Sequence, residues 1–402
     1  MAITGAGCIT PLGRGCEALW DGLSGNRCAI GEVSWLKDEP VASRNGGEVR
    51  GYRAEDHFNA SELLLYERGT QFGLLAAAEA VAGSGVAESL PGRAAKTGVF
   101  IGTAIAGAET FHRSYLELYR EGYATLHPLT VPKVMANAIA GQIAIRYGIK
   151  GPSYTYCTAC ASSTQAIGEA YRMIQSGRIE AALAGGSDAC MTPVVWRAWE
   201  AVRAMARDTC RPFSRNRSGM VLGEGAGMLV MEALPRALER GARIMAEVAG
   251  YALNVDAADI VRPSVSGPAA AMWDALEDAG VERAGIGYIN AHGTGTVLND
   301  QCETDAIKRV FGELAGGLAV SSSKSALGHL MGAAGAVETI AALMPFERGM
   351  APPTLNYLGT DPGCDLDYVA NVARAAAPRA VLKNSFAFGG LNVSLVLKRY
   401  PD

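Results

Sequence analysis

Short apolar runs that end in glycine recur along the chain and predict buried strands. They lie at 96–107, 181–189, 225–232, 286–296 and 317–324. Runs of this kind between turn residues are typical of strands that are covered on both faces. The pattern therefore predicts a buried sheet built from several short strands.

Helical periodicity fills the intervals between these runs. In 161–177, apolar side chains recur at positions 166, 167, 170, 171 and 174, which lie on one face of a helix. Further helices are predicted at 61–85, 266–280 and 332–349. Strands that alternate with helices indicate an α/β fold with largely buried sheets.

Two predicted strand-to-helix transitions resemble each other. The segment "SYTYCTAC" places Cys160 just before a helix, and "AVSSSKSALGH" places His329 in the corresponding position. The chain contains no obvious linker and no repeat with the short period of a solenoid. The similarity of the two transitions suggests that the fold contains two related halves.

Composition narrows the class of protein further. The chain has 402 residues, of which 49% are hydrophobic and 19% charged, and this favours a large core over disorder. A formal net charge of −4 disfavours nucleic-acid binding. No apolar run reaches about 18 residues, so no membrane span is predicted. The nine cysteines are scattered and odd in number, which indicates reduced thiols in the cytoplasm rather than a disulfide scaffold.

Cys157 and Cys160 form a C-x-x-C spacing that allows three interpretations. A zinc site would need a second pair of ligands, but no second C-x-x-C exists and the five histidines are far apart in sequence. A thioredoxin-like redox pair would need a small βαβ domain. Two small buried side chains are the ordinary alternative, because free cysteines are often buried.

The position of Cys160 favours a fourth interpretation, in which it is a nucleophile. A helix is predicted to begin at Ala161, and the unpaired amides of a helix N-terminus stabilise an anion. A thiol in that position is expected to have a lowered pKa, and the same amides could hold a thioester oxyanion. Cys157 lies earlier in the strand and is predicted to be a packing residue.

Two histidines could complete such a site. His292 follows an apolar run in "NAHGTGT", and His329 lies in "SKSALGHLMGAAG" together with Lys324. A lone histidine is more often structural, but both of these lie at predicted strand ends among glycines, where α/β folds tend to build sites. One cysteine and two such histidines form a plausible set for thioester chemistry.

Two other motifs carry less weight. The "GEGAG" at 223–227 lacks the acidic residue that a dinucleotide-binding fold requires. The arginine-rich segment 203–217 is either a solvated surface or a docking patch for an acidic partner.

Several motifs together resemble one family, the condensing enzymes of the 3-oxoacyl-acyl carrier protein synthase II group and the related type II polyketide ketosynthases. The resemblance rests on "TACASS", "HGTGT", "SKSALGHLMGAAGAVE" and "NSFAFGGLN", in this order, and it extends over essentially the whole chain.

The resemblance implies a thiolase fold, in which two pseudo-repeated halves form a five-layered α/β/α/β/α molecule. The first half would span residues 1–245 and carry the nucleophilic cysteine, and the second would span 246–402 and carry the two catalytic histidines. It also implies a homodimer with active sites near the interface. A heterodimer with a ketosynthase-like partner stays open.

The resemblance also implies the catalytic roles. Cys160 would accept an acyl chain as a thioester from an acyl carrier protein. His292 and His329 would assist decarboxylation of a malonyl unit and stabilise the enolate that forms. Lys324 would support the region around His329. The amides of Cys160 and Phe388 would form an oxyanion hole.

Further residues are implied in substrate binding. Phe388 would gate access to the acyl pocket, and Thr294 and Thr296 would contact the phosphopantetheine arm. Phe386 and Trp199 would also contact substrate. Neither a metal nor an organic cofactor is expected, because the substrates arrive on the phosphopantetheine of the carrier protein.

The chain departs from the usual family pattern in places that touch partner and substrate. Positions 62–66 read Glu-Leu-Leu-Leu-Tyr, where the family commonly has basic residues that meet the carrier protein. Asp259 and Val261 replace the histidine and threonine that the fatty acid enzymes tend to have.

Other departures concern the acyl pocket. Trp196 and Trp199 lie near a segment that borders this pocket, and two large aromatic side chains there could shorten or reshape it. Leu391 occupies a position that is often polar. These changes favour a specialised polyketide or lipid synthase over a general fatty acid enzyme.

Three alternatives follow from the same residues. A non-condensing partner subunit, like a chain-length factor, normally lacks the nucleophile, which is present here. An active subunit could require such a partner. A coenzyme A-dependent thiolase usually needs a second catalytic cysteine late in the chain, and Cys364 does not lie in such a motif.

Overall fold

One mixed sheet forms the centre of the protein, for which a computed structural model describes residues 1–37 and 39–401. The first five long strands in the chain are β1 (Ala2–Thr10), β5 (Thr97–Gly102), β6 (Ser153–Tyr156), β7 (Ala181–Asp188) and β8 (Gly225–Glu232). The next five are β9 (Ala246–Val255), β10 (Ile286–Asn290), β11 (Ala319–Ser321), β14 (Ala380–Ala387) and β15 (Leu391–Lys398). These positions confirm the strands predicted from the apolar runs.

The two sets of five strands repeat one topology. In each set the spatial order is third, second, fourth, fifth and first strand, as in β6-β5-β7-β8-β1 and β11-β10-β14-β15-β9. The second strand runs parallel to the third and fourth, and the fifth runs antiparallel to the fourth and first. Short pairing between β1 and β9 joins the halves. The repeat confirms the predicted pseudo-duplication.

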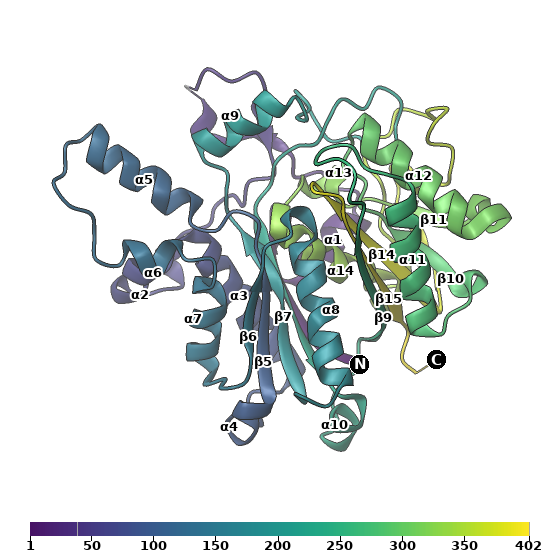
Figure 1. Cartoon of the computed structure of the whole chain (residues 1–402), viewed down its shortest axis with the longest axis horizontal. Helices are drawn as coiled ribbons and strands as arrows, with labels where there is room; N and C mark the ends of the chain where they lie inside the picture. The colour runs from purple at the N-terminus through teal and green to yellow at the C-terminus, as the bar shows by residue number, and fades with distance from the viewer. Residues whose placement is uncertain (38, 402) are drawn as a thin grey trace.

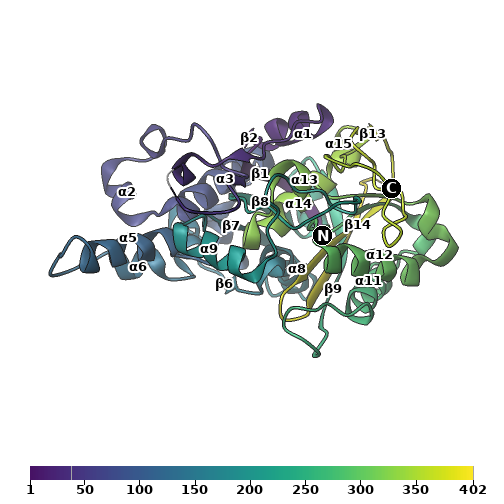
Figure 2. The same ribbon diagram turned by 90° about the horizontal axis from the view of Figure 1, so that it is seen from above.

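Helices complete five layers, which follow one another from left to right in Figure 1. Helices α3 (Arg68–Ser84) and α7 (Ala138–Tyr147) cover the outer face of the first set of strands. Helices α8 (Ser162–Gln175) and α14 (Ala334–Ala342) pack together between the two sets. Helices α11 (Ser266–Ala279) and α12 (Val297–Phe311) cover the second set, as Figure 2 shows from above. This is the expected thiolase arrangement.

The boundary between residues 245 and 246 stays a prediction. It is supported by the start of β9 at Ala246, where the second copy of the topology begins.

The central helices can lie close together because α14 consists mostly of small residues. All nine of its residues are buried, in the sequence AGAVETIAA. At Gly335 a Cβ atom would lie 2.1 Å from Oγ1 of Thr164 on α8, so only glycine permits this approach. Glu338 is the one charged residue of α14, and it is buried. A carboxylate in this layer requires buried partners.

Two of the four predicted helices are confirmed as α8 and α11, and the other two were predicted too long. The predicted helix 61–85 is two helices, α2 (Ala60–Leu65) and α3, because Tyr66 adopts an extended conformation between them. Asn59 caps α2 in a capping box with Glu62. The predicted helix 332–349 ends at Ala342, and α15 (Met344–Glu347) begins a new turn at Pro345, which lacks an amide donor.

The remaining elements are short or peripheral. Helices α5 (Ala108–Tyr119) and α6 (Thr130–Val134) project from the body of the molecule in Figure 1. The others are α1 (Cys16–Ser24), α4 (Leu90–Arg93), α9 (Pro193–Val202), α10 (Leu234–Glu239), α13 (Lys324–Leu327), β2 (Gly13–Arg14), β3 (Gly31–Glu32), β4 (Asn45–Gly46), β12 (Met350–Ala351) and β13 (Arg374–Ala375). Among the described residues, no helix combines the length and the apolar character that crossing a membrane requires.

Candidate active site

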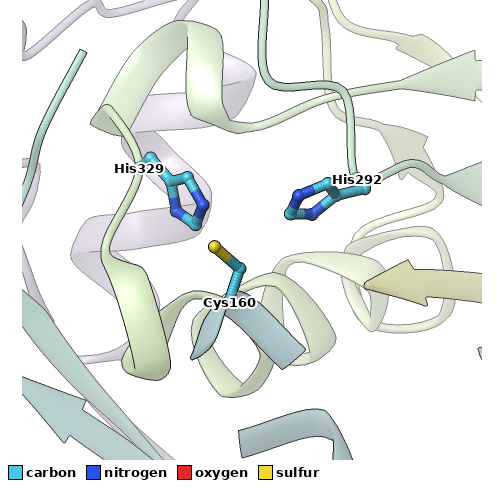
Figure 3. Close-up of side chains that lie close together, drawn as sticks. All are labelled: Cys160, His292 and His329. Carbon is cyan, nitrogen blue, oxygen red and sulfur yellow. The ribbon is translucent and has the colours of Figure 1, made fainter. Parts of the chain in front are cut away.

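Cys160, His292 and His329 meet at one point, although they lie far apart in the sequence. Cys160 precedes α8, His292 follows β10, and His329 follows α13. The sulfur and one nitrogen of each ring lie within 4.8 Å of one another, and all three residues are buried. The ring centroids of the two histidines are 5.5 Å apart at an interplanar angle of 81°. Figure 3 shows the Cys160 sulfur pointing into the space between the rings. The structure thus brings together the three residues that the sequence singled out.

The backbone around Cys160 is tightly constrained. Ala159 has a φ of 48°, which is unusual for a residue with a Cβ, and Cys160 follows it in a short 3₁₀ turn that leads into α8. The first turn of α8 lies directly on the end of β5. A Cβ at Gly102 would lie only 2.2 Å from the amide nitrogen of Ser163. Glycine at the strand end therefore allows α8 to begin where Cys160 reaches the site.

The pKa of Cys160 differs from the sequence prediction. Burial raises the pKa of this thiol to about 12, and this effect outweighs the favourable charge of Lys324. The prediction of a lowered pKa is therefore wrong for the enzyme without substrate. A raised pKa favours the neutral thiol form of Cys160 at neutral pH.

His329 presents one free donor to the site. Its Nδ1 accepts a hydrogen bond of 3.2 Å from the amide of Met331, so the proton of the neutral ring lies on Nε2. Nε2 is buried and has no hydrogen-bond partner among the described residues. Burial and the charges of Lys324 and Lys383 hold the pKa of His329 well below its usual range. The ring is therefore a neutral donor.

His292 is oriented in the same way by different partners. The ammonium of Lys324 lies 3.3 Å from Nδ1 of His292 and donates to its carbonyl oxygen at 2.7 Å. Because an ammonium can only donate, Nδ1 is the acceptor and Nε2 carries the proton. Burial, Lys324 and His329 lower the pKa of His292 well below its usual range. Both histidines therefore present Nε2–H groups.

The predicted role of Lys324, to support the region around His329, stays a prediction. Its ammonium makes direct contacts with His292, and its charge lowers the pKa of His329. Lys324 also forms a buried ion pair with Glu338 on α14. The tight turn at Gly328, with a φ of 75°, separates Lys324 from His329 after α13 and turns the two side chains to different partners.

The side chains of Cys160, His292 and His329 line a cavity of about 300 Å³. The residues predicted to bind substrate also line it, namely Thr294, Thr296, Phe386, Phe388 and Trp199. The hydroxyls of Thr294 and Thr296 are 2.8 Å apart. The structure thus gathers every predicted substrate-binding side chain around one space. Lys324 lies behind His292 and does not line it.

Only one of the two predicted tryptophans reaches this cavity. Trp199 stacks on Phe388 with ring centroids 5.6 Å apart and an interplanar angle of 29°. Trp196 is fully buried, donates from Nε1 to the carbonyl of Ser43 at 2.9 Å and contacts Trp35 edge-on. Trp196 packs in the core and does not line this cavity, so its predicted influence on the acyl pocket stays a prediction.

Cys157 is also placed differently from the prediction. It is exposed, because it follows β6, the strand at one edge of the sheet, and its sulfur contacts the carbonyl of Ala104 at 3.5 Å. The prediction of a packing residue is therefore wrong in this chain, although Cys157 indeed lies apart from the catalytic set.

The same three side chains also raise the question of a metal. A thiol and two imidazoles within 4.8 Å could in principle bind one divalent ion. One feature opposes such a site, because the ammonium of Lys324 lies beside His292 and its positive charge repels a cation. The expected absence of a metal stays a prediction.

Several acidic residues that support the site were missed from the sequence. Glu303 on α12 accepts hydrogen bonds of 2.8 Å from the amides of both His292 and Gly293, and burial raises its pKa to about 7. Asp300, one turn earlier, accepts from the amide of Gly295. A signal was present, because the two carboxylates follow "HGTGT" at a spacing of three on one face of a helix.

The arginine-rich segment 203–217 divides into two kinds of residue. Arg203 and Arg207 are exposed, and Arg203 lines the mouth of the cavity. Arg217 is buried and pairs with Asp361 at 3.0 Å. Neither a solvated surface nor a docking patch for an acidic partner therefore describes the whole segment 203–217.

The departures around 62–66 and 259–261 have structural consequences. Glu62 pairs with Arg146 at 2.6 Å, while Leu64 is 52% exposed. Asp259 accepts from the amides of Val261 and Arg262, so its carboxylate stabilises its own loop at the mouth of the cavity. Leu391 begins β15 and is half-buried.

These features define a class of protein. A duplicated thiolase-type fold with a buried cysteine and two neutral histidine donors at the end of a cavity is the arrangement of a thioester-dependent condensing enzyme. Residues 1–237 match the N-terminal domain of β-ketoacyl synthases, and residues 245–358 match the C-terminal domain. The chain belongs to the β-ketoacyl synthase family, and it is accordingly an acyltransferase.

Curated relatives match over nearly the full length. Nodulation protein E of Rhizobium sp. (strain N33) is 42% identical over 399 residues, which cover 99% of each chain. The 3-oxoacyl-acyl-carrier-protein synthase 2 of Synechocystis sp. is 39% identical over 409 residues, covering 100% of this chain and 98% of the relative.

Solved structures show the same fold. The ishigamide ketosynthase/chain length factor superposes with a TM-score of 0.94 at 35% identity, covering 99% of this chain and 98% of that one. A second match comes from the structure of a type II polyketide acyl-carrier protein in complex with its ketosynthase bound to the hexaketide. The TM-score is 0.91 at 31% identity, and the match covers 99% of this chain and 98% of that one. Both similarities confirm that the chain is a ketosynthase-type condensing enzyme.

Proposed function

We propose that the protein condenses an acyl group held on Cys160 with malonyl-acyl carrier protein, and releases 3-oxoacyl-acyl carrier protein and CO₂. The observation that carries this proposal is the orientation of His292 and His329, whose Nε2–H groups are both available as neutral donors beside the cysteine sulfur. Donors that are fixed in a buried site stabilise negative charge that develops during a reaction.

The first step loads the enzyme. The sulfur of Cys160 attacks the carbonyl carbon of an acyl thioester, a new C–S bond forms, and the bond to the phosphopantetheine sulfur breaks. The proton that Cys160 loses is taken up by the leaving phosphopantetheine thiolate. We assign the oxyanion hole for this step to the backbone amides of Cys160 and Phe388. A single hydrogen-bond donor of this kind stabilises the transition state by about 3 kcal/mol.

The second step forms the carbon–carbon bond. Loss of CO₂ from the malonyl unit leaves an electron pair on C2, and the enolate oxygen accepts hydrogen bonds from His292 and His329. C2 then attacks the acyl carbonyl, and the C–S bond to Cys160 breaks. Because decarboxylation generates the carbon nucleophile, the reaction needs no strong base.

The cavity residues have proposed roles in substrate access. Thr294 and Thr296 contact the phosphopantetheine arm, and Phe386 lines the reaction chamber. Phe388 gates the acyl pocket, a role supported by its 37% exposed side chain and its place between two glycines and Ala387. Trp199 stacks on Phe388 and so limits how far the gate can move.

A carrier protein is the proposed macromolecular partner of the cavity mouth. Arg203, Arg207 and Arg262 are exposed, and Arg203 and Arg262 line the opening together with the carboxylate of Asp259. Exposed arginines attract an acidic partner on an otherwise mildly acidic protein. The lack of basic residues at 62–66 makes this face the better candidate for docking.

A second copy of the chain is the proposed partner of the β6 edge. Tyr154 on this edge strand is 48% exposed. The projecting α5–α6 region adds further exposed apolar side chains, namely Phe111, Tyr115, Tyr119, Tyr123, Val131 and Met135. A homodimer would cover both surfaces. A heterodimer with a ketosynthase-like subunit is the alternative, and full condensing activity of the purified homodimer would exclude it.

We further propose a specialised polyketide or lipid pathway, supported by the large Trp199 side chain at the gate. The test offers the enzyme a panel of acyl carrier-protein thioesters with malonyl-acyl carrier protein and measures products by mass spectrometry. The wild type should prefer a narrow range of chains. Trp199→Ala should accept longer or bulkier chains, with a change in kcat/KM of about tenfold. Absence of any 3-oxoacyl product across the panel would refute the proposed reaction.

A further inference from the structure

Lys383 is a buried cation to which the reaction gives no role. It lies in the middle of β14, and its side chain has no exposed surface. All residues of β14 up to Phe386 are buried, so a lysine here cannot extend its ammonium to solvent as surface lysines do. A charge that is removed from water in this way needs compensating partners.

The ammonium of Lys383 finds these partners on both central helices. It lies 2.9 Å from Oγ1 of Thr164, on the first turn of α8 after Cys160, and it also contacts the hydroxyl of Ser385. It forms an ion pair of 3.3 Å with Oε2 of Glu338 on α14. Lys383 therefore connects the strand that leads to Phe388 with the helix of the nucleophile and with α14.

Glu338 is shared between two lysines. Its Oε1 pairs with Lys324, and its Oε2 faces Lys383. Lys324 in turn contacts Nδ1 and the carbonyl oxygen of His292. A continuous chain of charged contacts thus runs from Lys383 through Glu338 and Lys324 to a catalytic imidazole. Without Lys383, one oxygen of Glu338 would lack a cation, and the carboxylate could rotate.

The second lysine also changes the charge of the site. Two ammoniums and one carboxylate leave a net positive charge within the buried cluster. This charge contributes to the low pKa values of both His292 and His329. Burial lowers the pKa of Lys383 itself to about 8, although Glu338 opposes this effect. Lys383 therefore loses its proton, and the cluster its net positive charge, at a pH just above neutral.

Other titratable groups face the cluster from the neighbouring elements. Glu303 on α12 has a pKa raised by burial to about 7, and it favours the charged form of Lys383. Tyr288 on β10 lies near Glu338, and burial raises its pKa above the normal range. The pKa of Cys160 is about 12. Cys160 and Tyr288 keep their protons between about pH 7 and 9, the range in which Lys383 loses its proton, and Glu303 loses its proton mainly below about pH 8.

We propose that Lys383 is a positioning residue of the condensing site, which fixes Glu338 and Lys324 against His292 and keeps both imidazoles neutral. The proposal rests on the proposed function, because its readout is the condensation reaction. Lys383 acts through Glu338 and Lys324 and does not itself line the cavity.

The test compares wild type with Lys383→Met, which keeps the length of the side chain and removes its charge. At pH 7 the variant should lose about tenfold in kcat for malonyl decarboxylation, with KM changed by less than about twofold. Wild-type kcat should fall as the pH rises through about 8, because Lys383 then becomes neutral and releases Glu338. In Lys383→Met this alkaline decrease should be absent.

Two controls separate positioning from a purely structural role. Lys308→Met removes a half-exposed lysine that pairs with Asp365, and it should retain the wild-type pH profile. Glu338→Gln should abolish most of the effect of Lys383→Met when the two are combined, because both act along one chain of contacts. The melting temperature of Lys383→Met should not fall, since the remaining Lys324–Glu338 pair is neutral overall.

Three results would overturn the proposal while the wild type condenses normally. They are an unchanged kcat in Lys383→Met, the same alkaline decrease in this variant, or additive effects with Glu338→Gln. If Lys383→Met fails to fold, the wild-type profile still decides, because a constant kcat between about pH 7 and 9.5 contradicts the role of Lys383. A wild type that forms no product would instead refute the proposed function.

Discussion

Protonation of the two catalytic histidines follows from the partner of each Nδ1 atom. A backbone amide donates to Nδ1 of His329, and an ammonium faces Nδ1 of His292. Both partners are donors, so the ring protons lie on Nε2, where they face the cysteine. Two different local structures therefore give both rings a neutral form with the proton on Nε2. Two such donors are suited to stabilising an enolate oxygen.

Nuclear magnetic resonance of protein labelled with ¹⁵N in histidine can test this assignment. At pH 6.5, where a free imidazole is half protonated, His292 and His329 should be neutral with the proton on Nε2, because burial and nearby lysines lower their pKa. The variants His292→Asn and His329→Asn assign the signals. Titration of either residue near pH 6.5, or a proton on Nδ1, would contradict the assignment.

The residue scale is also where sequence prediction reached its limit. Cys160, His292 and His329 could be identified because their motifs are local. The pKa of Cys160 could not, since it depends on burial by segments far away in the chain. The resemblance associated Lys324 with the region around His329, and it could not show the direct contact with His292, which lies 32 positions away. Lys383 stands in an apolar strand, and nothing in the sequence showed what it pairs with.

At the scale of elements, the approach of α8 to β5 places the nucleophile. Periodicity predicted α8, and the apolar runs located β5, β7, β8, β10 and β11, whereas β1, β9, β14 and β15 were not among the predicted runs. Periodicity could not predict the break between α2 and α3, because the extended conformation of Tyr66 is imposed by tertiary packing. The outward position of Cys157 was equally hidden, since sequence alone does not show that β6 is an edge strand.

Gly102→Ala tests the importance of this approach. The added Cβ would lie 2.2 Å from the amide nitrogen of Ser163, so the first turn of α8 must shift. We expect a loss of about 1–3 kcal/mol in the free energy of unfolding and a lower rate of Cys160 acylation. Urea denaturation and intact-protein mass spectrometry measure the two effects.

Gly83→Ala is the matched control for this substitution. It lies in α3, and a Cβ there would meet no atom within 4 Å. Its stability should be equal to that of the wild type or slightly higher, since alanine favours helices. Equal behaviour of the two variants would show that the close contact at Gly102 does not position the nucleophile.

At the scale of the whole molecule, the proposed function gives separate tasks to the exposed arginines and to the buried site. The arginines would attract a large acidic partner, and the cavity would admit only its phosphopantetheine arm and acyl group. Mutations at the mouth should therefore affect association, whereas mutations in the cavity should affect the chemical steps.

Arg203→Glu combined with Arg207→Glu tests this division. Both side chains are exposed, so the fold should not change. KM for acyl carrier-protein substrates should rise about tenfold or more, while kcat stays within about twofold. With a short acyl-pantetheine thioester, which lacks the carrier protein, the double variant should match the wild type. An equal loss with both substrates would place these arginines in the chemistry instead of docking.

The central claim is that Cys160 carries the acyl group during condensation, and intact-protein mass spectrometry tests it most directly. After incubation with an acyl carrier-protein thioester, wild type and Cys157→Ala should each gain the mass of one acyl group, and Cys160→Ala should gain none. Addition of malonyl-acyl carrier protein should then remove the adduct and release 3-oxoacyl-acyl carrier protein. An adduct on Cys160→Ala, or no adduct on wild type across a broad panel of chains, would contradict the claim.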